Sequence, residues 1–90
     1  MNILIVDDDE QVRTLLRSLL QCEGHRALTA NDGVDALEVL RHEPVDAIIT
    51  DIMMPRMDGY RLCQAVRRDE RLKAIPFIFH TATYTSPADE

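Results

Sequence analysis

The chain has 90 residues, which is enough for one domain at most. Its 16 Asp and Glu residues outnumber its 10 Lys and Arg residues, for a net charge of −6. This acidic balance argues against a nucleic acid or an anionic membrane surface as a partner. No apolar stretch approaches the roughly 20 residues that span a bilayer.

The first residues enter a strand pattern at once, so we see no secretory leader. The two cysteines, Cys22 and Cys63, are far apart and lack the spacing of a metal site. Reduced thiols are the simplest interpretation, and they are typical of cytoplasmic proteins. We therefore expect a cytoplasmic domain.

Strand and helix patterns alternate along the chain. Residues 3–6 form a continuous apolar run, which predicts a fully buried strand. Residues 9–23, to within a residue or so, repeat Leu and Val at helical spacing, and Gly24 is a suitable stop for that helix. A short, weaker strand is expected at residues 26–30.

Two aspartates mark the starts of further helices. Asp32 and Asp58 each follow a loop pattern and are suited to the N-cap position. On the helix after Asp32, we expect Val34, Leu37 and Leu40 to face inward. The remaining expected elements are a helix end near His42, a strand at 45–50, a helix end near Asp69, a strand at 76–80 and the start of a further helix within 84–90.

Alternating strands and helices predict an α/β fold, with a parallel sheet and helices on both of its faces. In such sheets, ligands bind beyond the carboxyl ends of the strands. Three strand ends carry polar residues: Asp7 and Asp8, Asp51, and Thr81. With the strand order 2-1-3-4, these ends would be neighbours about 4.8 Å apart.

Each of these residues has an ordinary explanation when taken alone. Acids commonly begin helices, Asp51 could be a turn residue, and Thr81 could simply favour a strand. Their coincidence at neighbouring strand ends is what points to a site, because clustered carboxylates repel one another without a cation, and Mg²⁺ suits them. We expect the other candidate ligands to be structural: Met53, Met54 and Met57 as packing residues, and His25, His42 and His80 at the surface or at strand edges.

Four stretches also carry a resemblance to a family. They are residues 3–9, 31–37, 51–59 and 75–82, and the third of them reads D-x-M-M-P-x-M-D-G directly after a strand. Over essentially all 90 residues, the chain resembles the receiver domain of two-component response regulators. The resemblance implies a three-layer, doubly wound, flavodoxin-like parallel sheet of order 2-1-3-4, formed by a single domain of residues 1–90.

The resemblance also implies a role for each site residue. Asp51 would accept a phosphoryl group from a sensor histidine kinase or a phosphotransfer protein. Asp8, Asp51 and the backbone carbonyl of Met53 would bind Mg²⁺, and Asp7 would act mostly through water. Thr81 and the backbone amide of Ala82 would contact the phosphoryl group. Such a domain is a signalling module rather than a turnover enzyme.

Receivers have a fifth β-α unit, with a lysine on its strand, and these 90 residues do not include it. We therefore expect either a fragment of a longer protein or a truncated receiver that exposes its fourth strand and self-associates through residues 76–84. Two alternatives remain open: a receiver-like interaction module that does not signal, and a dehalogenase-like phosphohydrolase. The phosphohydrolase would need a second acid at the position of Met53.

Overall fold

The structure, a computed structural model, describes residues 1–54 and 56–80, and the elements within them alternate as expected. Thr81, Ala82 and the helix start expected within 84–90 lie outside the described residues. The elements are β1 (Asn2–Val6), α1 (Glu10–Cys22), β2 (Arg26–Ala30), α2 (Gly33–His42), β3 (Ala47–Asp51), α3 (Gly59–Arg67) and β4 (Phe77–His80).

Aspartate side chains cap the starts of α1, α2 and α3. Asp32 Oδ1 accepts the backbone N–H of Asp35, and Asp58 Oδ1 accepts that of Arg61, both at 2.9 Å. Asp9 caps α1 in the same manner. Each cap satisfies an N–H group that has no partner within its helix. Gly24, just beyond α1, has a positive φ of 87°, which glycine adopts without strain.

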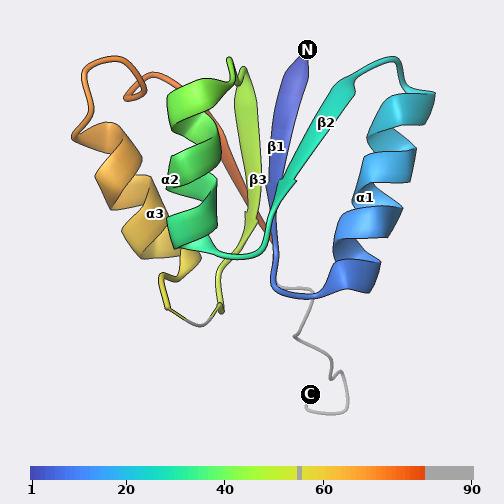
Figure 1. Cartoon of the computed structure of the whole chain (residues 1–90), viewed down its shortest axis with the longest axis horizontal. Coiled ribbons are helices and arrows are strands. Elements are labelled where there is room, and N and C mark those ends of the chain that lie inside the picture. The colour runs from blue at the N-terminus through green and yellow to red at the C-terminus, as the bar shows by residue number, and fades with distance from the viewer. Residues whose placement is uncertain (55, 81–90) are drawn as a thin grey trace.

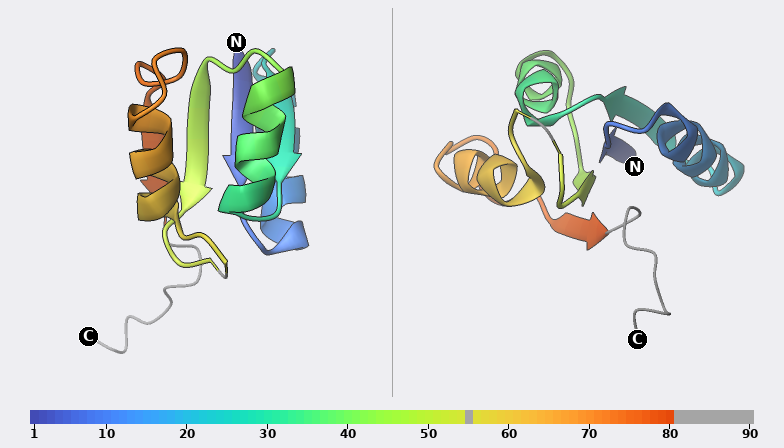
Figure 2. Two further views of the ribbon diagram at one scale, coloured as in Figure 1. Left: turned by 60° about the vertical axis from the view of Figure 1, so that its left-hand side comes forward. Right: turned by 90° about the horizontal axis from the view of Figure 1, so that it is seen from below.

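The sheet is parallel throughout and has the order β2-β1-β3-β4, as the resemblance implied. The helices α2 and α3 cover one face, and α1 covers the β1–β2 part of the other (Figure 2). In Figure 1 the arrows of β1, β2 and β3 all point toward the lower edge. The residues that follow these strands therefore meet at that carboxyl edge.

The buried core lies between the sheet and the α2–α3 layer. On the other face α1 has no buried residue, and Leu15 and Leu19 are 60% and 53% exposed. No helix among the described residues is long and apolar enough to cross a membrane. The buried core residues are Leu4, Val6, Ala30, Ala36, Leu40, Ile48, Leu62 and Val66.

The expectation that Val34 faces inward is wrong, because this side chain is exposed. The buried residues of α2 are Gly33, Ala36 and Leu40, which lie at the i, i+3 and i+7 positions of one helical face. Val34 is one residue, or about 100°, away from Gly33 around the helix axis, and so it turns toward solvent.

Several element ends differ from the expected ones by one or two residues. The strand β4 begins at Phe77 rather than at Pro76, although the Pro76 carbonyl already accepts the N–H of Ile48 at 3.0 Å. The helix α3 ends at Arg67, because Asp69 closes a tighter turn onto Val66. As expected, β4 is an edge strand of the described sheet, and Ile78 is 56% exposed.

Candidate functional site

Three carboxylates meet at the carboxyl edge of the sheet. Asp7 and Asp8 follow β1, Asp51 ends β3, and one oxygen from each lies within 4.8 Å of the others. Asp7 and Asp51 are 1% and 0% exposed, whereas Asp8 is exposed. The order β1-β3 at the centre of the sheet produces this cluster from residues more than forty positions apart.

Short backbone contacts orient the two buried carboxylates. Asp7 Oδ1 accepts the N–H of Asp9 at 2.8 Å, and Asp51 Oδ1 accepts the N–H of Met53 at 3.2 Å. In both residues the second oxygen, Oδ2, is buried and has no hydrogen-bond partner among the described residues. Since buried polar atoms are normally paired, these two oxygens are available to a ligand.

The surroundings of Asp7 disfavour its charged form. Burial is the largest effect and raises the pKa of this carboxyl, and the neighbouring charges of Asp51 and Asp8 raise it further. The N–H of Asp9 and the nearby His80 act in the opposite direction without reversing the shift. A cation at the cluster would relieve this repulsion, which is the physical reason for considering a metal site.

The site also depends on a close backbone approach at Gly59. A Cβ atom at this position would lie 2.5 Å from the Asp51 carbonyl oxygen and 3.2 Å from Ile52 Cα. The Gly59 N–H donates to the Ile52 carbonyl at 3.1 Å. The start of α3 is therefore held directly against the end of β3, and only glycine fits between them.

The β3–α3 loop is also tied to the start of α2. Arg56 Nη2 lies 2.6 Å from Asp32 Oδ2, and Arg56 Nε donates to the same oxygen at 2.7 Å. Arg56 has a φ of 65°, unusual for a residue other than glycine. Nearby, the N–H of Gly33 donates to the Met57 carbonyl at 3.3 Å. These contacts fix the loop that carries Met53.

The three methionines of this loop do not share one environment. Met54 and Met57 pack against the core, as expected, but Met53 is exposed, so the expectation that it packs is wrong. Its backbone N–H donates to Asp51 Oδ1 at the start of the loop, while its side chain is 66% exposed. In a dehalogenase-like enzyme this position would carry the second acid.

Sequence reasoning missed one residue of the site, His80. His80 lies on the edge strand β4, in keeping with the expected surface or strand-edge position, but its Nε2 atom is buried and lies 3.3 Å from Asp7 Oδ2. His80 ends β4 and is the register partner of Asp51 on β3. Thr81 was selected because it directly follows the fourth strand. His80 is the last residue of that strand, and the same argument would have selected it if strand-end residues had been included.

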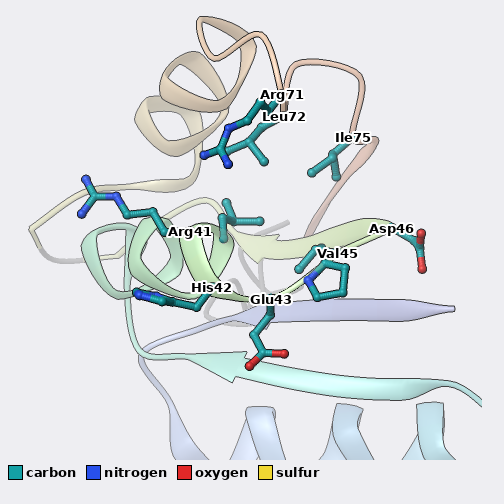
Figure 3. A pocket seen from close by; sticks show the side chains of 10 residues that line it. Arg41, His42, Glu43, Val45, Asp46, Arg71, Leu72 and Ile75 are labelled. Carbon is teal, nitrogen blue, oxygen red and sulfur yellow. The ribbon is translucent and has the colours of Figure 1, made fainter.

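The sheet's opposite edge carries a hollow of about 410 Å³, lined partly by Val45, Leu72 and Ile75 (Figure 3). It lies before β3, at the amino end of the strand whose carboxyl end is Asp51. In Figure 3 the charged groups of Glu43 and Asp46 point away from each other. The one group of metal-ligating side chains found in the described part of the chain lies at the other edge, where ligands of parallel sheets bind.

The acidic edge fits a hard divalent cation. Its donors are carboxylate oxygens, two of them buried and unpaired among the described residues, and the exposed Asp8 leaves one side open. Mg²⁺ characteristically binds one or two carboxylates and keeps its remaining positions for water or phosphate oxygens. The geometry therefore defines an α/β domain with a strand-end carboxylate site that is suited to binding a cation and phosphate together.

Comparison with known proteins identifies the family. The response regulator receiver domain matches residues 3–89, and the chain belongs to that family. A probable transcriptional regulator, ycf27 of Guillardia theta, is 42% identical over 80 residues, which are 89% of this chain and 30% of the relative. The sensor histidine kinase RcsC of Escherichia coli K12 is 50% identical over 68 residues, 76% of this chain and 7% of the kinase.

Solved structures agree with this assignment. The N-terminal domain of a response regulator receiver protein from Methanoculleus marisnigri JR1 is 33% identical, with a TM-score of 0.87 over 97% of this chain and 71% of that one. Chemotaxis protein CheY4 of Vibrio cholerae is 36% identical, with a TM-score of 0.86 over 98% of this chain and 72% of that one. The flavodoxin-like receiver fold is thus confirmed, and this chain is a signal-transduction module of two-component systems.

Proposed function

We propose that this domain accepts a phosphoryl group on Asp51. An oxygen of the Asp51 carboxylate would form a bond to phosphorus, and the phosphorus–nitrogen bond of a phosphohistidine donor would break, leaving its electron pair on the histidine. The observation that carries this proposal is the buried Oδ2 of Asp51, which has no hydrogen-bond partner among the described residues and faces a cluster of acids. Positioning and charge neutralisation supply most of the catalysis in such transfers.

The cation that fits the proposal is Mg²⁺. Asp8, Asp51 and the backbone carbonyl of Met53 would hold it, and Asp7, whose Oδ1 is already occupied by the N–H of Asp9, would act through water. Bound there, Mg²⁺ would neutralise the charge of the carboxylates and of the incoming phosphoryl oxygens. We assign the remaining phosphoryl contacts to the Thr81 hydroxyl and the Ala82 amide, on the family resemblance.

In this proposal the domain, residues 1–90, is regulatory and does not turn over a substrate. Its donor would be a sensor histidine kinase or a phosphotransfer protein, in keeping with the regulators and sensor kinases that it resembles. The chain spans about a third of the length of the regulators it matches. The proposal therefore concerns this domain and not the activity of a whole regulator. Both cysteines are free, which suits the reducing cytoplasm where we place the domain.

The direct test is labelling with acetyl phosphate in the presence of Mg²⁺, followed by intact-mass measurement. We expect one added phosphoryl group in the wild type, none in Asp51→Asn, and none after chelation of Mg²⁺. Asp46→Asn is a matched control at the opposite edge of the sheet. Asp46 Oδ2 accepts the Asn2 N–H at 2.7 Å, and an asparagine oxygen can accept it equally. Undiminished labelling of Asp51→Asn would refute the assignment.

We also propose that the domain self-associates through residues 76–84, of which 76–80 are described. Among the described residues, β4 pairs only with β3, and its other edge is open. Ile78 on one face and Phe79 on the other are both exposed. Exposed apolar edge strands tend to pair with another chain, and a second copy would present the same edge.

A further inference from the structure

The loop between β3 and α3 is joined to the start of α2 at two places. Arg56 directs two nitrogen atoms at one carboxylate oxygen, with Nη2 2.6 Å and Nε 2.7 Å from Asp32 Oδ2. One residue further along each segment, the N–H of Gly33 donates to the Met57 carbonyl at 3.3 Å. The Met57 side chain fills the space in front of Gly33, because a Cβ atom there would lie 2.6 Å from Met57 Cγ. The contact therefore has a charged part and a packed part.

The helix cap accounts for only one of the two Asp32 oxygens. Oδ1 accepts the N–H of Asp35 at 2.9 Å and so caps α2, whereas Oδ2 is paired with Arg56. The Arg56 side chain is 60% exposed, and it loses conformational freedom when it is held against a carboxylate that is only 9% exposed. The cap does not require this second contact, so its explanation lies in the loop rather than in the helix.

The backbone of Arg56 also needs an explanation. Its φ of 65° lies in the left-handed region, which glycine adopts readily and arginine rarely. Such conformations persist where surrounding contacts hold them, and they are common beside ligand sites. The Asp32 contact and the adjacent Gly33–Met57 pair hold Arg56 in this conformation. The Arg56 side chain thus fixes a turn that its residue type disfavours.

The turn at Arg56 lies on the loop that begins at the acidic site. At the start of the loop, the N–H of Met53 donates to Asp51 Oδ1 at 3.2 Å. At its end, the N–H of Gly59 donates to the Ile52 carbonyl at 3.1 Å. The loop is therefore anchored at both ends and, through Arg56, in between. Met53, whose carbonyl the proposed function assigns to Mg²⁺, lies in the chain between the first anchor and Arg56.

We propose that Arg56 and Asp32 are positioning residues of the cation site, which tie the β3–α3 loop to α2 and so hold the Met53 carbonyl ready for Mg²⁺. Neither residue contacts the ion. The inference rests on the proposed function and adds the residues that preorganise one of its ligands. A ligand that is held in place before the ion arrives binds more tightly, because less conformational freedom is lost on binding.

The test is Mg²⁺ affinity, measured by calorimetric titration of Mg²⁺ into the whole 90-residue chain. We expect this affinity to fall about threefold in Arg56→Met, an effect of the size that a partly exposed ion pair can contribute. Arg41→Met is the matched control, because it removes an exposed ion pair between Arg41 and Glu38, 3.3 Å apart on α2. The control loses the same charge but leaves the loop contact intact, so its Mg²⁺ affinity should equal that of the wild type.

Two further variants show whether the Arg56–Asp32 contact itself is responsible. Arg56→Gly permits the positive φ without strain but removes the side chain, so its Mg²⁺ affinity should be as low as that of Arg56→Met. In Asp32→Asn the amide oxygen can still cap α2, but the amide nitrogen cannot accept from Arg56. This variant should lose the same affinity, and the double variant with Arg56→Met should lose no more than either single variant.

The response to excess Mg²⁺ distinguishes positioning from a general disturbance of the site. At a Mg²⁺ concentration near the wild-type Kd, acetyl phosphate should label Asp51 more slowly in Arg56→Met than in the wild type. At saturating Mg²⁺ the two labelling rates should become equal, because only the metal affinity is weakened. A disturbed site would be slower at every Mg²⁺ concentration.

Several results would overturn the inference. They are equal Mg²⁺ affinities in Arg56→Met and the wild type, recovery of affinity in Arg56→Gly, additive losses in the double variant, and a labelling defect that persists at saturating Mg²⁺. The proposed function is scored separately. A wild type that binds Mg²⁺ but is not labelled on Asp51 would refute the phosphoacceptor assignment alone, because the comparison of Mg²⁺ affinities is read from binding.

Discussion

On the face covered by α2 and α3, buried side chains from three strands and two helices form a closed core. On the opposite face, α1 covers only β1 and β2, and Leu19 and Ile78 remain largely exposed. The row of Asp7, Asp51 and His80 belongs to this second face. The domain thus separates stability from chemistry: the well-packed face holds the strands in place, while the site lies at the carboxyl edge on the less covered face, where Asp7 and Asp51 are buried and Asp8 is exposed.

The same substitution on each face gives the largest expected contrast. Leu62 is fully buried on α3 and belongs to the core, whereas Leu19 on α1 is about half exposed. We expect Leu62→Ala to lower the free energy of unfolding by about 3 kcal/mol and Leu19→Ala by less than about 1 kcal/mol, because only the first leaves a cavity. Urea denaturation of both variants measures the contrast, and equal losses would contradict the difference between the faces.

On the face covered by α2 and α3, the Arg56–Asp32 pair should make the free energy of unfolding depend on pH. Burial is the largest influence on the pKa of Asp32 and raises it, but the N–H of Asp35 and the Arg56 side chain outweigh it, so the pKa is lowered. A lowered folded-state pKa stabilises the fold above the unfolded value of about 3.9 and loses that contribution as pH falls through the folded value.

We therefore expect Arg56→Met to cost about 1 kcal/mol at neutral pH, a modest value because the Arg56 side chain is largely exposed to solvent. The loss of stability between about pH 5 and pH 2 should become shallower, since Asp32 then has less to lose on protonation. Arg41→Met removes an exposed pair with Glu38 and serves as the control. If the free energy of unfolding depends on pH in the same way in both variants, the Arg56–Asp32 pair does not contribute to the stability of the fold.

The smallest effect on folding is expected on the open face, at Ile78. Because this side chain is already 56% exposed, Ile78→Lys should change the free energy of unfolding by about 0.5 kcal/mol or less. Self-association, measured by sedimentation over a range of concentrations, should nevertheless weaken, since lysine on an edge strand opposes pairing. A wild type that stays monomeric at every concentration would refute self-association through this edge.

Much of the fold could be predicted because its signals are local. The capping aspartates Asp32 and Asp58 act on N–H groups three residues away, and the apolar run at 3–6 is buried however its neighbours are arranged. The site residues Asp7, Asp8 and Asp51 could be selected because parallel strands bring their carboxyl ends to one edge. The strand order itself came from the family resemblance.

The sequence by itself thus determined the alternation of elements, the helix caps and the acidic edge, all of which depend on spacing along the chain. Only the tertiary structure decided that His80 reaches Asp7, that Arg56 binds Asp32, and that Met53 and Val34 face solvent. These contacts join residues up to 73 positions apart in the numbering, or depend on which helical face meets the sheet. Their physical origin is the register of neighbouring strands and the packing of helices, which no local pattern encodes.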